Sequence, residues 1–524
     1  MKARNQETET SKKKPRKETT KKEKKIGFEV STFRGFVPKK GCLMTRNPRL
    51  TLCGAAVALL MIVGGFPELA STAARASAAA SAQPPAASDK PMTMALTGDS
   101  LITLKLSVHT DPPFLKMIDL IRGADVAFTN FEMLLHDYEP YPSTQSGGTY
   151  MRAEPAIAKE LVWAGFDIVA RANNHTGDYG VEGARLTTKY LTEAGLVQAG
   201  FGESLREARE AKFLDTDRGR VALISVASTF PDPSRAGVSW GDTRARPGLN
   251  PLRFTTTSVV TRQQFDALRS ALTAVGQLGR GGRGADPSAT EMTAFGQRFV
   301  VGDKQETRSE PLKDDLDGIA AVVRNASKVA DYTIVNSHTH EGGADRYTPP
   351  QFFVTFARAM IDAGADVVTA SGPHVLRGIE IYKEKPIFYG LANFVFENET
   401  LLRQPPENYE PLGMKLESGA GVGDFNERRS NNDTTGFPAD ARFWESVIAM
   451  PRFAGKKLTE VKLYPITLGF KKPRPQRGWP MLANAELSRK IVDDVVKFSA
   501  PFGTRIEFKD GIGVVGLGAT RSDQ

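Results

Sequence analysis

The chain has 524 residues, 40% hydrophobic and 25% charged, an ordinary globular composition with enough apolar residues for a sizeable core. Its net charge of +9 is concentrated at one end, because residues 1–43 hold 14 Lys or Arg against 5 Asp or Glu, whereas residues 83–524 are slightly negative. The composition therefore excludes a basic nucleic-acid-binding body, and we expect no nucleic-acid partner.

Residues 1–43 form a Lys-rich leader that we expect to be disordered. Met44 opens a stretch that would serve as a normal signal-peptide start. A second interpretation is therefore that translation begins at Met44 and that the leader is not translated. Both interpretations leave the leader outside the folded protein.

A secretory signal is predicted within residues 44–82. An uncharged, largely apolar run at residues 50–66 follows Arg46 and Arg49 and precedes Ala-x-Ala sequences, which is the order of a signal peptide. The run is shorter than the roughly 20 residues that span a bilayer, which favours cleavage over a signal anchor. We expect an exported protein, periplasmic or extracellular, that is anchored to the membrane by residues 50–66 if the signal is not cleaved.

Both cysteines, Cys42 and Cys53, precede the expected cleavage position, so the exported protein would contain neither a thiol nor a disulfide. Residues 83–91 belong to a linker rich in Ala, Pro and Ser. The folded part is predicted to comprise a main domain at residues 92–396 and an extension at residues 397–524 that completes the same domain.

From residue 92 onward, short apolar runs alternate with segments of helical periodicity, which predicts an α/β fold. The predicted strands are Met92–Thr97, Asp125–Thr129, Asp167–Ala170, Val221–Ser228, Tyr332–Ser337, Asp366–Thr369 and Leu458–Leu463. The predicted helices are Val181–Ala194, Arg262–Val275, Asp315–Val329, Pro350–Ala363 and Ala485–Phe498.

Three segments interrupt this alternation, at residues 228–252, 279–284 and 405–435. They are polar or rich in Gly, and none has a repeat. We expect them to be surface loops or insertions.

Polar side chains follow five of the predicted strands. They lie in the segments Thr97-Gly98-Asp99-Ser100, Asn130-Phe131-Glu132, Asn173-Asn174-His175-Thr176-Gly177-Asp178, His338-Thr339-His340-Glu341 and Ser371-Gly372-Pro373-His374. Strand ends of an open α/β sheet converge on one edge, where ligands bind. We therefore expect these side chains to form one site.

Only six histidines occur in the chain, and four of them lie in these segments: His175, His338, His340 and His374. Carboxylate, amide oxygen and imidazole suit divalent ions such as Mn, Zn or Fe, while the lack of thiols excludes a cysteine-type zinc site. The sequence therefore predicts a site for divalent metal.

The motifs and their order resemble the CapA-type poly-γ-glutamate capsule synthesis proteins. The resemblance lies in Gly98-Asp99, Asn130-Phe131-Glu132, the segments 172–180, 338–341 and 372–382, and the closing segment 386–396. It implies a calcineurin-like metallophosphoesterase fold, in which two sheets between helices form a four-layer α/β/β/α sandwich.

The same resemblance implies that Asp99, Glu132, Asn174, His338 and either His374 or His340 are metal ligands. It also implies that His175 is catalytic, as a general acid that protonates the leaving group. Asp178 would either orient His175 or cap the helix that begins near Val181, and its position before that helix favours the cap.

One position departs from the family pattern, which usually has His-Pro-His where this chain has Gly372-Pro373-His374. Glycine has no side chain to ligate a metal, so a second ion would bind weakly unless His340 takes over this role.

The resemblance implies an exported metal-dependent hydrolase in capsule or poly-γ-glutamate biosynthesis or processing. Its partners would be the anionic envelope polymer and membrane-bound capsule synthesis proteins. Two alternatives remain open: a non-catalytic polymer-binding or export-accessory protein with a degenerate metal site, and a general phosphatase or nucleotidase.

Overall fold

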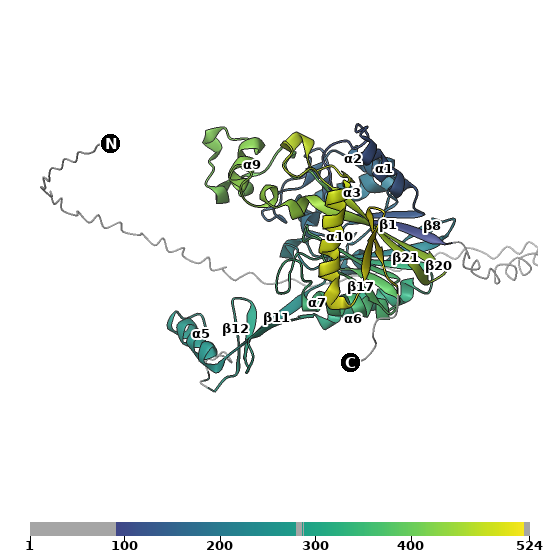
Figure 1. Ribbon diagram of the computed structural model, residues 1–524. Helices are drawn as coiled ribbons and strands as arrows, with labels where there is room; N and C mark the ends of the chain where they lie inside the picture. The colour runs from purple at the N-terminus through teal and green to yellow at the C-terminus, as the bar shows by residue number, and fades with distance from the viewer. Residues whose placement is uncertain (1–90, 279–285, 287, 518–524) are drawn as a thin grey trace, which may run out of the picture. The chain divides into compact units, whose positions relative to one another are not determined.

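The computed structural model describes residues 91–278, 286 and 288–517 (Figure 1). The predicted leader, the secretory signal and the Gly/Arg loop at 279–284 lie outside these residues, as does the linker up to residue 90. Among the helices of the described part, none combines the length and apolar character needed to cross a membrane.

The larger of two main sheets has ten strands, and β1 (Met92–Leu101) lies at its centre. Parallel strands extend from one side of β1 in the order β2 (Val126–Phe131), β5 (Ile168–Ala170) and β6 (Val197–Ala199). The short strand β19 (Asn393–Phe396) also pairs with β1 in parallel. The sequence-predicted strands at 92, 125 and 167 are thus confirmed.

The other side of this sheet comes from the C-terminal part of the chain. Strand β20 (Glu445–Ala454) pairs antiparallel with β1, and β21 (Lys457–Thr467) pairs with β20, as Figure 1 shows. The sheet ends in β24 (Ile512–Val515) and β23 (Ile506–Lys509). The strands within residues 445–515 therefore belong to the same sheet as β1.

The second main sheet has six strands. Its order is β17 (Ile379–Tyr382), β18 (Lys385–Phe388), β16 (Val367–Ser371), β15 (Tyr332–His338), β9 (Gly219–Ala227) and β8 (Lys212–Thr216). The four inner strands, from β18 to β9, are parallel and their predicted members are confirmed.

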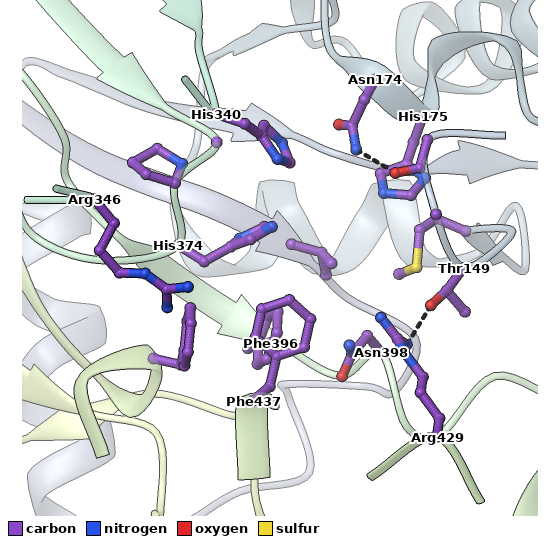
Figure 2. A pocket seen from close by; sticks show the side chains of 17 residues that line it. Thr149, Asn174, His175, His340, Arg346, His374, Phe396, Asn398, Arg429 and Phe437 are labelled. Carbon is purple, nitrogen blue, oxygen red and sulfur yellow. Dashed lines mark hydrogen bonds between the residues drawn. The ribbon is translucent and has the colours of Figure 1, made fainter. Parts of the chain in front are cut away.

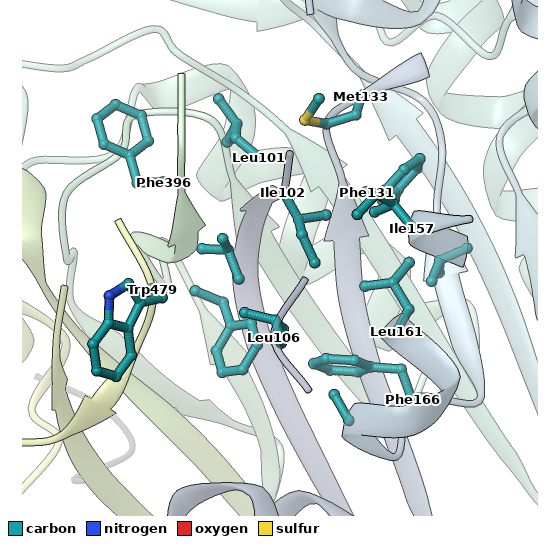
Figure 3. Close-up of a cluster of buried hydrophobic side chains, with 14 of the residues drawn as sticks. Leu101, Ile102, Leu106, Phe131, Met133, Ile157, Leu161, Phe166, Phe396 and Trp479 are labelled. Atoms are coloured by element: carbon teal, nitrogen blue, oxygen red, sulfur yellow. The ribbon is translucent and has the colours of Figure 1, made fainter. Parts of the chain in front are cut away.

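Three apolar clusters define the layers of the fold. One joins the two sheets, with Leu96 of β1 against residues such as Leu223 and Ile334 of the second sheet. Helices α1 (Pro112–Arg122), α2 (Ile157–Ala164) and α3 (Gly180–Glu193) cover the outer face of the first sheet, where Figure 3 shows Leu161 with Phe131 and Ile102.

Helices α6 (Lys313–Ala326) and α7 (Gln351–Asp362) cover the outer face of the second sheet with side chains such as Val323 and Phe356. Helix α10 (Ala485–Ser499) adds Ile491 and Val495 to the core between the sheets. The expected α/β/β/α sandwich is therefore confirmed.

An unpredicted four-stranded sheet lies between β9 and α6 in sequence. It consists of β11 (Phe254–Val260), β12 (Glu291–Ala294), β13 (Gln297–Val301) and β14 (Glu306–Pro311), with helix α5 (Arg262–Ala274) packed on it. Its core of Phe265, Leu272 and Met292 is small. Most of its strand residues are partly exposed, so the strands lack the apolar pattern from which the others were predicted.

The prediction of a loop at residues 405–435 is wrong in part, because this segment contains α8 (Pro406–Tyr409) and α9 (Val422–Ser430). The Asp424 carboxylate accepts the Gly421 N–H at the start of α9, and Asn431 ends the helix in a left-handed conformation. Only Phe425 among its apolar residues is buried, so no helical periodicity marks α9. The segment 228–252 is largely irregular, as expected, with β10 (Gly248–Leu249) near its end.

Glu397, which directly follows β19, should make stability depend on pH. Burial raises its pKa from 4.5 to about 7, despite N–H donors from Thr103 and Leu104. The unfolded chain then releases the proton at lower pH than the folded chain, so stability should fall as pH rises from 4.5 to about 7 and level off above. The free energy of unfolding should decrease by about 3 kcal/mol over this pH range.

Urea unfolding of wild type and Glu397→Gln between pH 4.5 and 8 measures this effect. The difference between the two free energies of unfolding should shift in favour of the variant as pH rises. An unchanged difference across this range would show that Glu397 titrates normally in the folded state.

Candidate metal centre

The predicted polar side chains converge because they follow parallel strands of both sheets. Asp99 lies in β1 and Glu132 directly follows β2, while His338 ends β15. His340 and His374 lie in the loops after β15 and β16. The structure thus brings all five sequence-predicted carboxylate and imidazole ligands into one cluster.

Two groups of three side chains could each hold a metal ion, and Glu132 belongs to both. One group is Asp99, Glu132 and His338, and the other is Glu132, His340 and His374. Three imidazoles surround Glu132 Oε1, with the Nε2 atoms of His338, His175 and His374 at 3.5, 3.6 and 3.9 Å. A shared carboxylate of this kind fits a centre for two ions.

The Glu132 carboxylate is fully buried, and neither of its oxygens has a hydrogen-bond partner within the described residues. Burial, together with the charges of Asp99 and Asp178, raises its pKa well above the ordinary value. A buried, unpaired carboxylate is costly unless a proton or a cation compensates its charge. The residues present therefore fit a divalent cation.

The histidines are suited to the same purpose. Burial lowers the pKa of His338 and, together with neighbouring His338 and His374, lowers that of His340 well below its ordinary value. Neutral imidazole is the form that binds metal. The Nε2 atoms of His338 and His340 lie 2.9 Å apart, so both ring nitrogens are directed toward the same space.

Asp99 is held as a carboxylate. Burial by itself would raise its pKa, but hydrogen bonds with His338 and His374 keep the pKa below its usual range. The Gly372 N–H and the Asn130 amide also donate to its two oxygens, at 2.9 and 2.8 Å. The centre thus combines an ionised Asp99 with neutral His338 and His340.

Asn174 lies in the turn after β5 and lines the same cavity as His340 and His374 (Figure 2). Its amide nitrogen donates to Gly147 O at 2.9 Å, while its Oδ1 is buried without a partner in the described part of the chain. This orientation leaves the oxygen free to act as a ligand, as the sequence suggests.

His175 is oriented by Asp178 through a hydrogen bond of 2.6 Å from its Nδ1. Asp178 also accepts the N–H groups of Gly147 and Met151, whereas helix α3 has no side-chain cap. The favoured capping role of Asp178 is therefore wrong, because three donors other than the helix N-terminus occupy its carboxylate. His175 Nε2 is left facing Glu132 and the cavity.

His340 occupies the space that a side chain at position 372 would need. A Cβ added to Gly372 would lie 2.9 Å from His340 Cδ2 and 3.2 Å from His338 Nε2. Gly372 also has a φ of +106°, which other residues rarely adopt. Glycine is thus required here, and His340 places its own imidazole in the cluster.

His374 is fixed from outside the cluster. Its Nδ1 lies 2.8 Å from Asn393 Oδ1, and the Asn393 amide donates to Phe443 O. This contact with β19 leaves His374 Nε2 for the centre. Asn393, which lies in the closing segment 386–396 of the family resemblance, thus orients a candidate ligand.

The cavity over the cluster has a volume of about 340 Å³. Phe396 of the closing segment 386–396 lines it, together with residues that belong to no motif and that sequence reasoning missed: Thr149, Arg346, Asn398, Arg429 and Phe437. Arg429 lies in α9, so the missed helix explains the missed residue. Two adjacent arginines at 428 and 429 were the only signal available in that segment.

Residues 74–398 match the family described as Bacterial capsule synthesis protein PGA_cap. Two uncharacterized proteins of Sinorhizobium fredii are each 37% identical over 81% of this chain and 93% of their own length. The Capsule biosynthesis protein CapA of Bacillus anthracis is 26% identical over 58% of this chain and 60% of its own length.

Among solved structures, the NAD nucleotidase of Haemophilus influenzae aligns over 78% of this chain and 56% of its own, at 10% identity and a TM-score of 0.27.

Replacing Glu132 by Gln should abolish most metal binding, because it removes the charge shared by both groups of ligands. Metal content after dialysis against Mn, Zn or Fe, measured by elemental analysis, tests this expectation. Glu397 is also a buried glutamate but lies outside the cluster, so Glu397→Gln should keep the metal content of wild type. Equal metal content in all three proteins would contradict the site.

Gly372→Ala should destabilise the protein by roughly 1–3 kcal/mol and lower metal content, because the new Cβ displaces His340 and strains the backbone. Gly195→Ala is the matched control, since Gly195 has a φ of +89° and open space around its Cβ position. It should lose stability but no metal. Metal content unchanged in Gly372→Ala would show that His340 is not a ligand.

Proposed function

Because this chain belongs to the bacterial capsule synthesis protein family, we propose that it is an exported metal-dependent hydrolase of an anionic envelope polymer of the poly-γ-glutamate type. It would act in the assembly, anchoring, release or trimming of that polymer. The predicted signal in residues 44–82 supports export, and membrane-bound capsule synthesis proteins are the expected protein partners.

The observation that supports hydrolysis best is the buried, unpartnered Glu132 carboxylate among imidazoles, next to a His–Asp pair. Simple polymer binding does not require a buried charge, which costs stability. Gly372 lacks the ligand side chain that the family usually has at this position, but the imidazole of His340 occupies the space beside it. The geometry therefore favours a functional centre over a relic.

Asp99, Glu132, Asn174, His338, His340 and His374 would hold one or two divalent ions at the base of the cavity. A bound ion supplies Lewis-acid polarisation of the carbonyl or phosphoryl oxygen of the substrate. Mn, Zn and Fe all suit this ligand set. Asn174, His340, His374 and His175 line the cavity, so a substrate bound there would have access to them.

His175 performs the proton transfer in this proposal. Asp178 holds Nδ1, so the charged imidazole can donate its Nε2 proton to the leaving atom as the bond to the carbonyl or phosphoryl centre breaks. Water supplies the hydroxyl that replaces the leaving atom, and its remaining proton returns the His175 imidazole to the charged form, which Asp178 stabilises before transfer. The bond cleaved is either an amide of the polymer or a phosphoester.

His175→Ala should lower kcat by roughly 10²–10⁴-fold while metal content stays unchanged. Turnover of γ-glutamyl peptides, nucleotides and a generic phosphodiester by the metal-loaded protein measures this effect. His109→Ala, a histidine change outside the cluster, should keep wild-type turnover.

The substrate panel also separates the alternatives. Cleavage of nucleotides but not of γ-glutamyl peptides would replace the proposal with a general nucleotidase. Binding of the polymer with no turnover of any substrate by the metal-loaded wild type would replace it with a polymer-binding protein.

A further inference from the structure

A second cavity of about 500 Å³ adjoins the one over the metal centre. The two cavities share five lining residues: Arg346, Asn398, Arg429, Phe437 and Phe443. This shared boundary connects the cavity over the metal centre to a second space that could hold the remaining part of an elongated ligand. Its side chains should therefore decide which ligand crosses it.

Two arginines face each other across this boundary, on opposite sides of Phe396 and Phe437 (Figure 2). Arg346 lies over the Phe443 ring at 4.9 Å, and Arg429 lies over the Phe437 ring at 5.6 Å. Phe437 and Phe443 contact each other edge to face, with their centroids 4.7 Å apart. The aromatic rings thus support both guanidinium groups without neutralising them.

Neither arginine forms an ion pair with a carboxylate of the described residues. The Arg429 side chain donates to Thr149, and the main chain of Arg346 is held by buried Arg377, which donates to its carbonyl. Among the residues that the structure describes, no carboxylate lines the cavity over the metal centre. The boundary is therefore positively charged on its metal side.

The acidic residues of the second cavity reduce this charge only in part. Glu399 is paired with Arg474 and Arg477. Asp440 has no ion pair within the described residues, and its carboxylate accepts the Arg442 N–H. One unpaired carboxylate against two unpaired arginines leaves a net attraction for an anion.

Asn398 adds a different chemical requirement. It is 5% exposed and lines both cavities, and its buried Oδ1 has no partner in the described part of the chain. This oxygen needs an N–H or O–H donor, which a chain of phosphates lacks. A polyamide with carboxylate side groups offers both the donor and the anions.

On the basis of the proposed function, we propose that Arg346, Arg429 and Asn398 form a subsite that binds a carboxylated polyamide across both cavities. The arginines bind carboxylates of the polymer and Asn398 accepts an N–H of the polymer backbone. A part of the polymer distant from the metal centre thereby aligns the bond that is cleaved there. Arg429 and Phe437 lie beyond the family match, which ends at residue 398. The subsite therefore combines Arg346 and Asn398, which lie within the family match, with Arg429 from the part of the chain that follows it.

The test is calorimetric binding of γ-linked glutamate oligomers of two and ten residues to the metal-loaded His175→Ala protein, which should bind without turnover. The longer oligomer should bind more tightly than the shorter one. Arg346→Gln and Arg429→Gln should each lower the affinity for the longer oligomer about tenfold. Arg428→Gln removes the same charge from the same helix outside both cavities and should have no effect. A polyphosphate of matched charge should bind more weakly than the longer oligomer. Asn398→Ala should reduce the difference in affinity between these two ligands.

Equal binding of the two oligomers, equal weakening by Arg428→Gln, or stronger binding of polyphosphate would each overturn the subsite. These results are separable from the failure of the hydrolase proposal. Binding through both arginines without cleavage by the wild type would support the subsite and overturn hydrolysis. Cleavage by wild type without length-dependent binding would support hydrolysis and overturn the subsite.

Discussion

The burial of the Glu132 carboxylate is the constraint on which the rest of the site depends. A charge fully removed from water must be compensated locally, and the neighbouring Asp99 and Asp178 carboxylates add to the charge to be compensated. Strands β1, β15 and β16 bring Asp99 and the histidines around it, while Asp178 and Asn393 hold the outer ring nitrogens of His175 and His374. The two-sheet sandwich brings the ends of its strands together around this carboxylate.

Much of this could be predicted, since the relevant signals are local. Apolar runs such as Val221–Ser228 predicted buried strands, and polar residues directly after them predicted a common edge. The family resemblance then assigned roles to residues such as Asn174, whose free Oδ1 suits a ligand. The metal and the catalytic role of His175 remain proposals, because strand-end geometry limits the chemistry without identifying it.

The parts that could not be predicted depend on contacts between distant residues. The sequence shows that Gly372 lacks a ligand side chain, but only the structure shows that His340 fills the same space. Helix α9 buries too little apolar surface to have a periodic pattern, so the position of Arg429 at the cavity was hidden. Strands β11 to β14 could not be predicted for the same reason, because their partly exposed residues give the sequence pattern of a polar loop.

The pairing of β1 with β19 and β20 has a consequence for folding. Asp99 aligns with Asn393, nearly three hundred residues later, and Leu96 aligns with Ala449. Contacts of such large sequence separation form slowly, because the entropy of closing a long loop must be lost first. The metal centre is therefore assembled late, and an ion that binds only the finished cluster would stabilise the native state without speeding its formation.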